Sequence, residues 1–200
     1  MKNIEMIKEI QQKLGIEVDG LAGPQTWSAI YTHILKKELP ASPTDQVDAR
    51  SEKVIATLQP EVQVYARALI HKAKEVGIDI KVISGLRTYA EQDKLYAQGR
   101  TDNINEGKVT NAKGGQSNHN FGIAFDIGIF EGKEYLTNSP KYKAVGALGM
   151  QLGLEWGGNW KTIVDQPHFQ LRPLWAKDLS EKEMLAVLRE RKEKNQAIYT

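Results

Sequence analysis

The sequence predicts an α+β fold, in which a small antiparallel sheet with flanking helices follows a small all-helical domain. Three observations favour this class. The first 38 residues carry only helical periodicity. Two later segments, 78–84 and 121–130, are rich in β-branched or alternating apolar residues. Helices, loops and short strands then follow one another without regular alternation and without an internal repeat.

Residues 1–38 are expected to form the helical domain. Apolar side chains recur at helical spacing over residues 3–14, at Ile4, Ile7, Ile10 and Leu14. Pro24 lies near the start of a second predicted helix, which runs through Trp27 to Leu35. Residues 39–50, LPASPTDQVDAR, contain two prolines and few apolar side chains, and we interpret them as a linker.

A second domain is expected over residues 51–178, followed by a C-terminal helix within 179–200. The predicted elements are helical segments around Pro60, strand 78–84, helix 89–98, a long polar loop at 101–120, strand 121–130, helix 141–152, and strand 168–171. Gly153 is expected to end the helix before it. Ser180 and Glu183 form a capping-box pattern at the start of the terminal helix.

Composition limits the chemistry. The chain of 200 residues has no cysteine, so a metal must be held by histidine and carboxylate side chains. A net charge of +2 gives no argument for a nucleic-acid partner. The N-terminus lacks the apolar core of a signal peptide, and no apolar run approaches the ~18 residues of a membrane span. We therefore expect a protein made in the cytoplasm without a signal peptide and without membrane insertion. Separately, we expect it to be a monomer.

Asp126 interrupts an apolar strand in an unusual way. Phe121, Ile123, Phe125, Ile127 and Ile129 share one face of the predicted strand, which must pack on a core. The opposite face carries Gly122, Ala124, Asp126 and Gly128, so the carboxylate has almost no bulk around it. This pattern suits the floor of a cleft. The alternative is an edge-strand aspartate whose small neighbours allow close packing.

Two of the four histidines, His119 and His168, fall outside predicted helices. His119 must reach Asp126 from the preceding loop, with Gly122 allowing the bend. Asp165 precedes His168 in an Asp-x-x-His turn that contains Pro167. Two histidines and a carboxylate suffice for a catalytic zinc site with an open position. The spacing leaves open whether Asp126 or Asp165 is the carboxylate ligand. The remaining histidines, His33 and His71, are interpreted as solvated helix residues.

The motifs together resemble the M15 zinc peptidases, which include D-alanyl-D-alanine carboxypeptidases and L-alanyl-D-glutamate endopeptidases. The matching segments are SNHNFGIAFD at 117–126, WGGNW at 156–160 and DQPHF at 165–169. The resemblance implies one zinc ion per chain held by His119, Asp126 and His168 within the predicted sheet. It also implies that Asp165 is the catalytic acid and base.

The segment SGLRT at 84–88 matches the family's Ser-Gly-x-Arg motif. The resemblance implies that Arg87 contacts substrate or developing negative charge; the alternative is an arginine in a surface ion pair. Gln92 and Ser117 are weaker candidates for binding substrate. Trp156 and Trp160 are interpreted as packing that supports the site.

The N-terminal unit resembles a helical peptidoglycan-binding domain. The residues that carry the resemblance are Ile10, Gln11 and Leu14, together with the DGLAGPQTW segment at 19–27. The alternative is a helical cap that only stabilises the enzyme, with Asp19 and Gly20 building a turn.

The combined resemblance implies a peptidoglycan hydrolase that cuts the L-Ala–D-Glu bond of the stem peptide, as a phage endolysin does. Such an enzyme would act on the bacterial cell wall after release from the cytoplasm. The alternatives are a D-Ala-D-Ala carboxypeptidase and a non-catalytic wall-binding module.

Overall fold

The structure is a computed structural model that describes residues 3–22, 26, 29–30, 33–34 and 46–199. The chain divides into two compact units, residues 1–41 and 42–200, and each is described by itself. Most of the predicted second helix at 24–35 and most of the predicted linker at 39–50 lie outside the described residues.

The N-terminal unit contains helix α1, Asn3–Leu14, as predicted. The buried amide of Gln11 organises the turn that follows this helix. Its Nε2 donates to Asp19 Oδ1 at 2.6 Å and to Thr26 Oγ1 at 2.9 Å, and its Oε1 accepts from Gly20 N at 2.8 Å. These polar residues of the motif at 19–27 therefore bind Gln11 and hold the turn.

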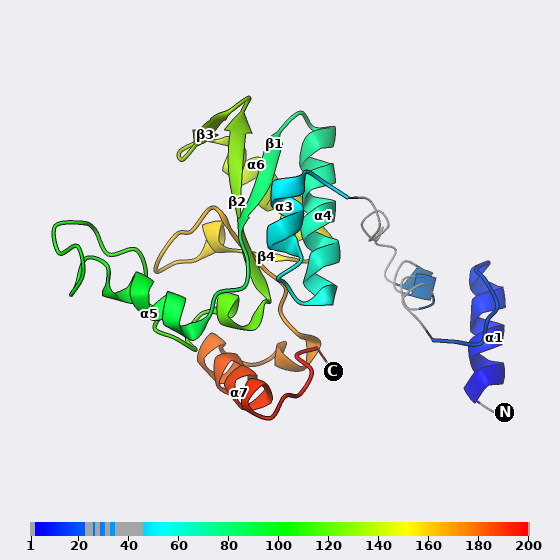
Figure 1. The fold of residues 1–200 in the computed structure, drawn as a ribbon. Coiled ribbons are helices and arrows are strands. Elements are labelled where there is room, and N and C mark those ends of the chain that lie inside the picture. Colours follow the sequence, from blue (N-terminus) through cyan, green and yellow to red (C-terminus); the bar gives the residue numbers. More distant parts are fainter. Residues whose placement is uncertain (1–2, 23–25, 27–28, 31–32, 35–45, 200) are drawn as a thin grey trace. The chain divides into compact units, whose positions relative to one another are not determined.

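The second unit is built on a five-stranded sheet with the order β1-β2-β5-β4, and β3 pairs with β2 beside this path. The strands are β1 (Asp79–Ser84), β2 (Ala124–Glu131), β3 (Glu134–Leu136), β4 (Glu155–Trp156) and β5 (His168–Gln170). Every pairing between these strands is antiparallel. The sheet and its surrounding helices confirm the predicted α+β class (Figure 1).

The helices are α3 (Ala49–Ile55), α4 (Pro60–Glu75), α5 (Tyr89–Ala97), α6 (Lys141–Leu152) and α7 (Glu181–Glu193), with short 3-10 helices η1 (Asn118–Phe121), η2 (Gly157–Asn159) and η3 (Leu174–Ala176). The predicted capping box of Ser180 and Glu183 is present at α7. Helix α3 begins inside the predicted linker because the Asp48 side chain accepts from the backbone of Arg50 and Ser51. In the described part of the chain, no helix is both long and apolar enough to cross a membrane.

One predicted strand boundary is wrong. The strand expected at 121–130 starts only at Ala124, because residues 118–121 form η1 and Gly122 turns the chain in the left-handed region with φ +69°. Phe121 therefore belongs to η1. It packs with α7 residues, including Met184 and Leu188, in a second apolar cluster.

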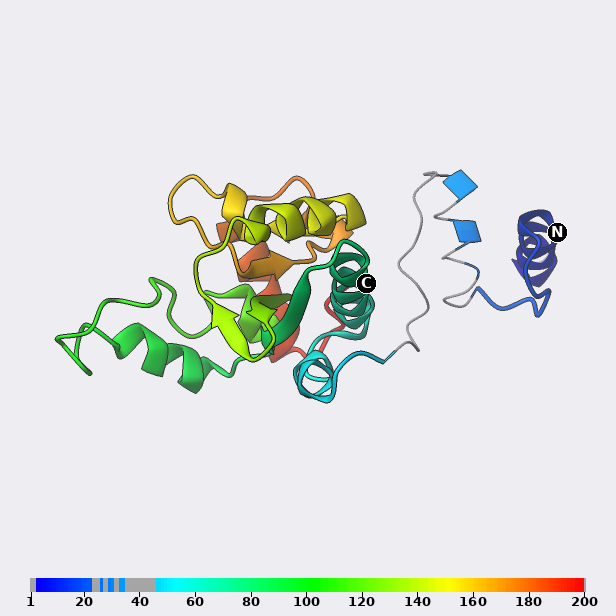
Figure 2. The same cartoon turned by 90° about the horizontal axis from the view of Figure 1, so that it is seen from above.

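The main core lies on one face of the sheet. Phe125, Ile127 and Ile129 of β2 are fully buried there, in one cluster with residues of α3, α4 and α6. Seen from above, α4 and α6 lie next to each other on this face (Figure 2). The predicted alternation of the strand is confirmed, so Asp126 points to the opposite face, away from the main core.

Candidate metal centre

Asp126 lies between two strands that each bring a polar residue beside it. Ser84 of β1 and His168 of β5 are its register partners on either side. The register of β1 shifts between Val82 and Ser84, and such a bulge re-aims the side chains at the end of a strand. The sheet thus places His168 and the end of β1 on the same face as the carboxylate.

His119 reaches this face from η1. Its carbonyl oxygen accepts from Arg87 N at 3.0 Å, which ties η1 to the segment that follows β1. Its Nδ1 lies 2.8 Å from Gly85 O. Because a carbonyl oxygen can only accept, Nδ1 carries the proton and Nε2 presents a lone pair. The approach of His119 from outside the strand, with the bend at Gly122, agrees with the prediction.

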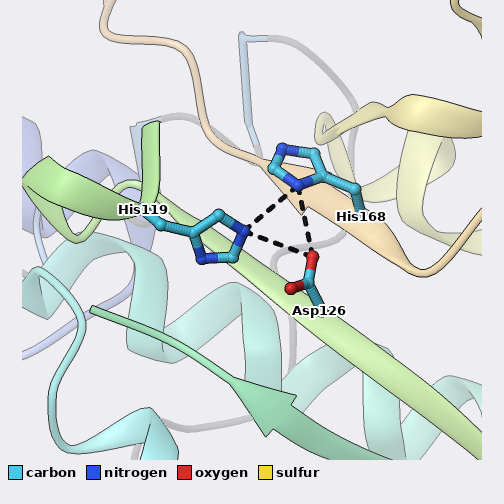
Figure 3. Close-up of side chains that lie close together, drawn as sticks. All are labelled: His119, Asp126 and His168. Atoms are coloured by element: carbon cyan, nitrogen blue, oxygen red, sulfur yellow. Dashed lines mark hydrogen bonds and ion pairs between the residues drawn. The ribbon is translucent and has the colours of Figure 1, made fainter. Parts of the chain in front are cut away.

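Three donor atoms converge in a nearly equilateral triangle (Figure 3). His119 Nε2 lies 3.2 Å from Asp126 Oδ1 and 3.3 Å from His168 Nδ1, and His168 Nδ1 lies 3.2 Å from Asp126 Oδ1. Zinc–nitrogen and zinc–oxygen bonds of about 2.0–2.1 Å at tetrahedral angles separate two ligand atoms by about 3.3 Å. The donors therefore fit one triangular face of a zinc coordination tetrahedron, and the fourth position remains for water or substrate.

The electrostatics of the triangle favour a bound cation. Burial acts to raise the pKa of Asp126, but the neighbouring imidazoles of His119 and His168 outweigh it and hold the pKa well below its usual range. Burial acts to lower the pKa of His168, but its hydrogen bond to Asp126 and the charge of that carboxylate raise the pKa overall. Positive charge is thus stabilised where the three donors meet.

The triangle opens into a cleft of about 1260 Å³, whose lining includes Asp165 and Arg87. Asp165 is half-buried, and its backbone N donates to Gly157 O at 3.0 Å. A Cβ atom at Gly157 would lie 2.5 Å from Asp165 O and 3.0 Å from the Cβ atom of His168, so only glycine fits beneath this turn. Burial, and then the charge of Asp126, raise the pKa of the Asp165 carboxyl. A carboxylate with a raised pKa is suited to accept and return a proton.

Arg87 points toward the carboxylate of Asp126, with Nη2 lying 3.8 Å from Oδ2. Its Nη1 donates to Gln92 Oε1 at 2.9 Å, and Nη2 donates to Ser84 Oγ at 3.1 Å. Gln92 is fully buried, and its Nε2 donates to Ala112 O at 2.8 Å. Among the described residues, the cleft lining includes Ser117 but not Gln92. Gln92 therefore lies behind Arg87 and holds it in place.

The two tryptophans differ in their surroundings. Trp156 is buried in the main core, as the packing interpretation expects. Trp160 is 38% exposed, and the centroid of its ring lies 4.8 Å from that of His168. The chain after η2 carries Trp160 to the cleft, so this ring supports His168 from the cleft side and is not part of the core.

Sequence reasoning missed the side chains that surround His168 on its far side. Gln170 Oε1 lies 3.0 Å from His168 Nε2, and Gln170 is buried. The two-residue period of a strand could have indicated it, because residues 168 and 170 share a face. Gln170 also binds Asn118 and Glu155, which come from distant segments of the chain. No spacing in the sequence predicts that these residues lie next to Gln170.

Comparisons with known proteins agree with this geometry. Residues 110–171 match a peptidase M15 family profile described as D-alanyl-D-alanine carboxypeptidase. The chain is 39% identical over 130 residues to the peptidoglycan L-alanyl-D-glutamate endopeptidase CwlK of Bacillus subtilis, an alignment that covers 60% of this chain and 77% of that protein. It is 30% identical over 125 residues to the L-alanyl-D-glutamate peptidase of Listeria phage A118, covering 61% of this chain and 41% of the phage protein.

The crystal structure of the L-Ala D-Glu endopeptidase ChiX of Serratia marcescens superposes with a TM-score of 0.47 at 25% identity, covering 66% of this chain and 96% of that one. The Bacillus relative carries the assignment, because identity and coverage are both high there. The chain belongs to the M15 family of metallopeptidases.

Proposed function

We propose that this protein is a peptidoglycan hydrolase that uses one zinc ion per chain to cut the L-Ala–D-Glu bond of the stem peptide. The observation that carries the proposal is the triangle of donor atoms from His119, Asp126 and His168, with separations of 3.2 to 3.3 Å. The names of the Bacillus and phage relatives support both the substrate and the bond.

The three donors would hold the zinc ion on the floor of the cleft. Zinc supplies Lewis acidity, which polarises the substrate carbonyl and makes a water molecule acidic enough to attack near neutral pH. Asp165 then accepts the proton of the attacking water at a carboxylate oxygen. It returns this proton to the nitrogen of the leaving amine, because an amine leaves readily only when protonated.

Arg87 supplies fixed positive charge beside the reacting carbonyl. Its guanidinium is held by Gln92 and Ser84, so it does not need to reorganise as negative charge develops on the carbonyl oxygen. Gln92 serves as a positioning residue in this scheme. Ser117 lies at the cleft and offers a hydroxyl to the substrate backbone.

The N-terminal unit would bind the wall polymer and keep the catalytic unit at its substrate. Attachment raises the local concentration of cleavable bonds without any new contact at the active site. The enzyme would act on the bacterial cell wall after release across the membrane, as in phage lysis.

Digestion of purified sacculi tests the proposal. Mass spectrometry should detect new N-terminal D-Glu on released stem peptides, and an excess of chelator should abolish these products. Release of free D-Ala without cleavage inside the stem would instead identify a D-Ala-D-Ala carboxypeptidase, the activity that the family profile describes. Binding to sacculi without any product would identify a non-catalytic wall-binding module.

A further inference from the structure

The side of His168 that faces away from the metal triangle is held by a buried glutamine. Gln170 is 1% exposed, and its Oε1 lies 3.0 Å from His168 Nε2. The amide nitrogen of Gln170 donates to Glu155 Oε2 at 2.6 Å. Because a carboxylate only accepts, Glu155 fixes which end of the amide faces the histidine. Gln170 Oε1 therefore accepts a hydrogen bond from the Nε2 proton of His168, which leaves the lone pair of Nδ1 for a metal. Without a metal, Asp126 Oδ1, at 3.2 Å from Nδ1, competes as the acceptor for this proton.

This glutamine belongs to a closed ring of five side chains. Asn118 Nδ2 donates to Gln170 Oε1 at 2.6 Å and also to Glu181 Oε1. Arg172 donates to Glu181 Oε2 at 2.8 Å and to Glu155 Oε1 at 2.5 Å. Glu155 in turn accepts from Gln170, which completes the ring. The five residues come from η1, β4, β5, the segment after β5, and α7.

The chemistry of the ring permits only one orientation of each amide. Its two carboxylates are acceptors and its guanidinium is a donor, so both amides must adapt to them. Turning the Gln170 amide would place its nitrogen against the amide nitrogen of Asn118 and its oxygen against the carboxylate of Glu155. The two hydrogen bonds that Gln170 makes in the ring would then be lost, together with the acceptor for His168.

The orientation of the Asn118 amide agrees with the ring. Asn118 is 5% exposed, and its Oδ1 is buried without a hydrogen-bond partner. A buried acceptor without a partner is unfavourable. The side chain nevertheless keeps this orientation, in which both amide hydrogens serve Gln170 and Glu181.

We propose that Gln170, oriented by the ring with Asn118, Glu155, Arg172 and Glu181, is a positioning residue that fixes the tautomer of His168 for metal binding. This inference rests on the metal role proposed above for the triangle, but it does not depend on which bond is cut. Mutation of a side chain that hydrogen-bonds a metal-ligating histidine typically lowers metal affinity by about 10–100-fold.

Three variants test the ring. Gln170→Leu removes the amide at similar volume, and zinc affinity should fall about 10–100-fold. Glu155→Gln should have a comparable effect without touching His168, because an amide at position 155 no longer fixes the Gln170 amide. The double variant Glu155→Gln with Gln170→Glu exchanges donor and acceptor, so His168 Nε2 again faces an acceptor. We expect its zinc affinity within a few-fold of the parent.

Zinc affinity is measured by competition with a chromophoric chelator. Nitrogen-15 NMR of the metal-free proteins, at a pH where the imidazole is neutral, reports the His168 tautomer directly. The parent and the double variant should show a larger fraction of the Nε2-protonated form than Glu155→Gln does, because Asp126 competes at Nδ1 in all three. Glu131→Gln is the matched control, because it removes a carboxylate that pairs with Lys141 outside the ring and should bind zinc like the parent.

Parent-like zinc affinity in both Gln170→Leu and Glu155→Gln would overturn the proposal, as would a double variant that binds zinc no better than Glu155→Gln alone. If Gln170→Leu does not fold, the comparison of Glu155→Gln with the double variant still tests whether the ring determines zinc affinity. A parent that binds zinc in the expected tautomer but releases no peptide would contradict the proposed function and leave the positioning role supported. A parent that binds no zinc would overturn both.

Discussion

Asp126 and His168 lie directly opposite each other in the antiparallel pairing of β2 with β5. Side chains at directly opposite positions lie within about 4.5–5.5 Å of each other at Cβ. The next pair in the same register, Phe125 and Phe169, stacks on the opposite face of the sheet with ring centroids 5.8 Å apart. The register that packs these two rings in the core therefore also brings two of the three donor atoms together.

Metal removal should change the pH dependence of stability. In the metal-free protein, the raised pKa of His168 contributes stability that is complete below about pH 6.5 and is lost as the pH rises through the folded-state pKa. The lowered pKa of Asp126 contributes stability that is present above about pH 3.8 and is lost as the pH falls through its folded-state pKa. The ion pair of Asp126 and His168 therefore stabilises the metal-free protein most between about pH 3.8 and about pH 6.5.

The metal-free protein loses stability as the pH rises through the pKa of His168, whereas zinc should stabilise the protein more as the pH rises. Zinc binds only neutral imidazoles, and its stabilisation of the fold grows with its affinity. Thermal melts with zinc or with excess chelator should differ little near pH 5 and clearly above about pH 7. An equal shift of Tm at both pH values would contradict a site made of two histidines and a carboxylate.

Replacing Asp165 should separate catalysis from metal binding. In Asp165→Asn, kcat should fall by about 10²–10⁴-fold, because the amide cannot accept the proton of the attacking water. Zinc content should remain at the parent level, since Asp165 is not one of the three converging donors. Metal analysis and muropeptide kinetics on the same preparation check both. Asp178→Asn, at an exposed position, is the control, and near-parent activity of Asp165→Asn would remove this residue from the mechanism.

The buried amide of Gln92 should matter through Arg87. Arg87→Lys loses the planar fork that binds Gln92 and Ser84, and kcat should fall about 10²–10³-fold, the effect of losing an oxyanion donor. Gln92→Leu should cause a smaller fall in kcat with unchanged zinc affinity. Gln92→Glu keeps the acceptor for Arg87 and should recover part of the loss. Parent-like kcat in Gln92→Leu would rule out the positioning role.

Gly149 of α6 should be sensitive to a single methyl group. A Cβ atom there would lie 2.4 Å from the ring of Phe169, which is fully buried and cannot move aside. Alanine favours the helix by about 1 kcal/mol, but overpacking costs about 1–3 kcal/mol, so Gly149→Ala should be destabilised by roughly 1 kcal/mol. Urea unfolding measures the difference. Gly107→Ala, where the added methyl meets open space, should unfold like the parent.

Removing residues 1–41 should distinguish a wall-binding unit from a cap. If the unit binds wall polymer, the shortened protein should melt like the parent and cleave a soluble muropeptide at the same rate, but lyse sacculi more slowly because local concentration is lost. A co-sedimentation assay with sacculi measures the binding itself. A lowered Tm with unchanged sedimentation would favour the stabilising cap.

The sequence predicted much of the fold because local signals were strong. Residues 141–152 form a helix that ends at Gly153, and the alternation over residues 125–129 identifies the face of β2 that packs on the main core. The boundary at Phe121 was missed, because an aromatic residue after a polar loop fits a strand and a 3-10 helix equally well. The choice between Asp126 and Asp165 as the third donor required the pairing of β2 with β5, and register between distant strands is not encoded in spacing.

The burial of Gln92 is a second feature that could not be predicted from the sequence. A glutamine on a short helix is usually exposed, and nothing in its neighbours predicts full burial. Its burial depends on the loop that carries Ala112 and on the segment after β1 that carries Arg87, because both contact its amide. Polar networks that join several segments are a property of the tertiary structure, so composition and periodicity could not reveal them.

The short strand β5 places chemistry and packing on alternate residues. His168 and Gln170 lie on the face of the triangle, while Phe169 packs against α6 at Gly149, where any side chain would collide with its ring. A slip of one residue would turn Phe169 toward Asp126 and bury His168 against the helices. The packing of Phe169 therefore disfavours such a slip whether or not a metal is bound. The packing of Phe169 on the apolar face of β5 thus fixes the register that places His168 opposite Asp126.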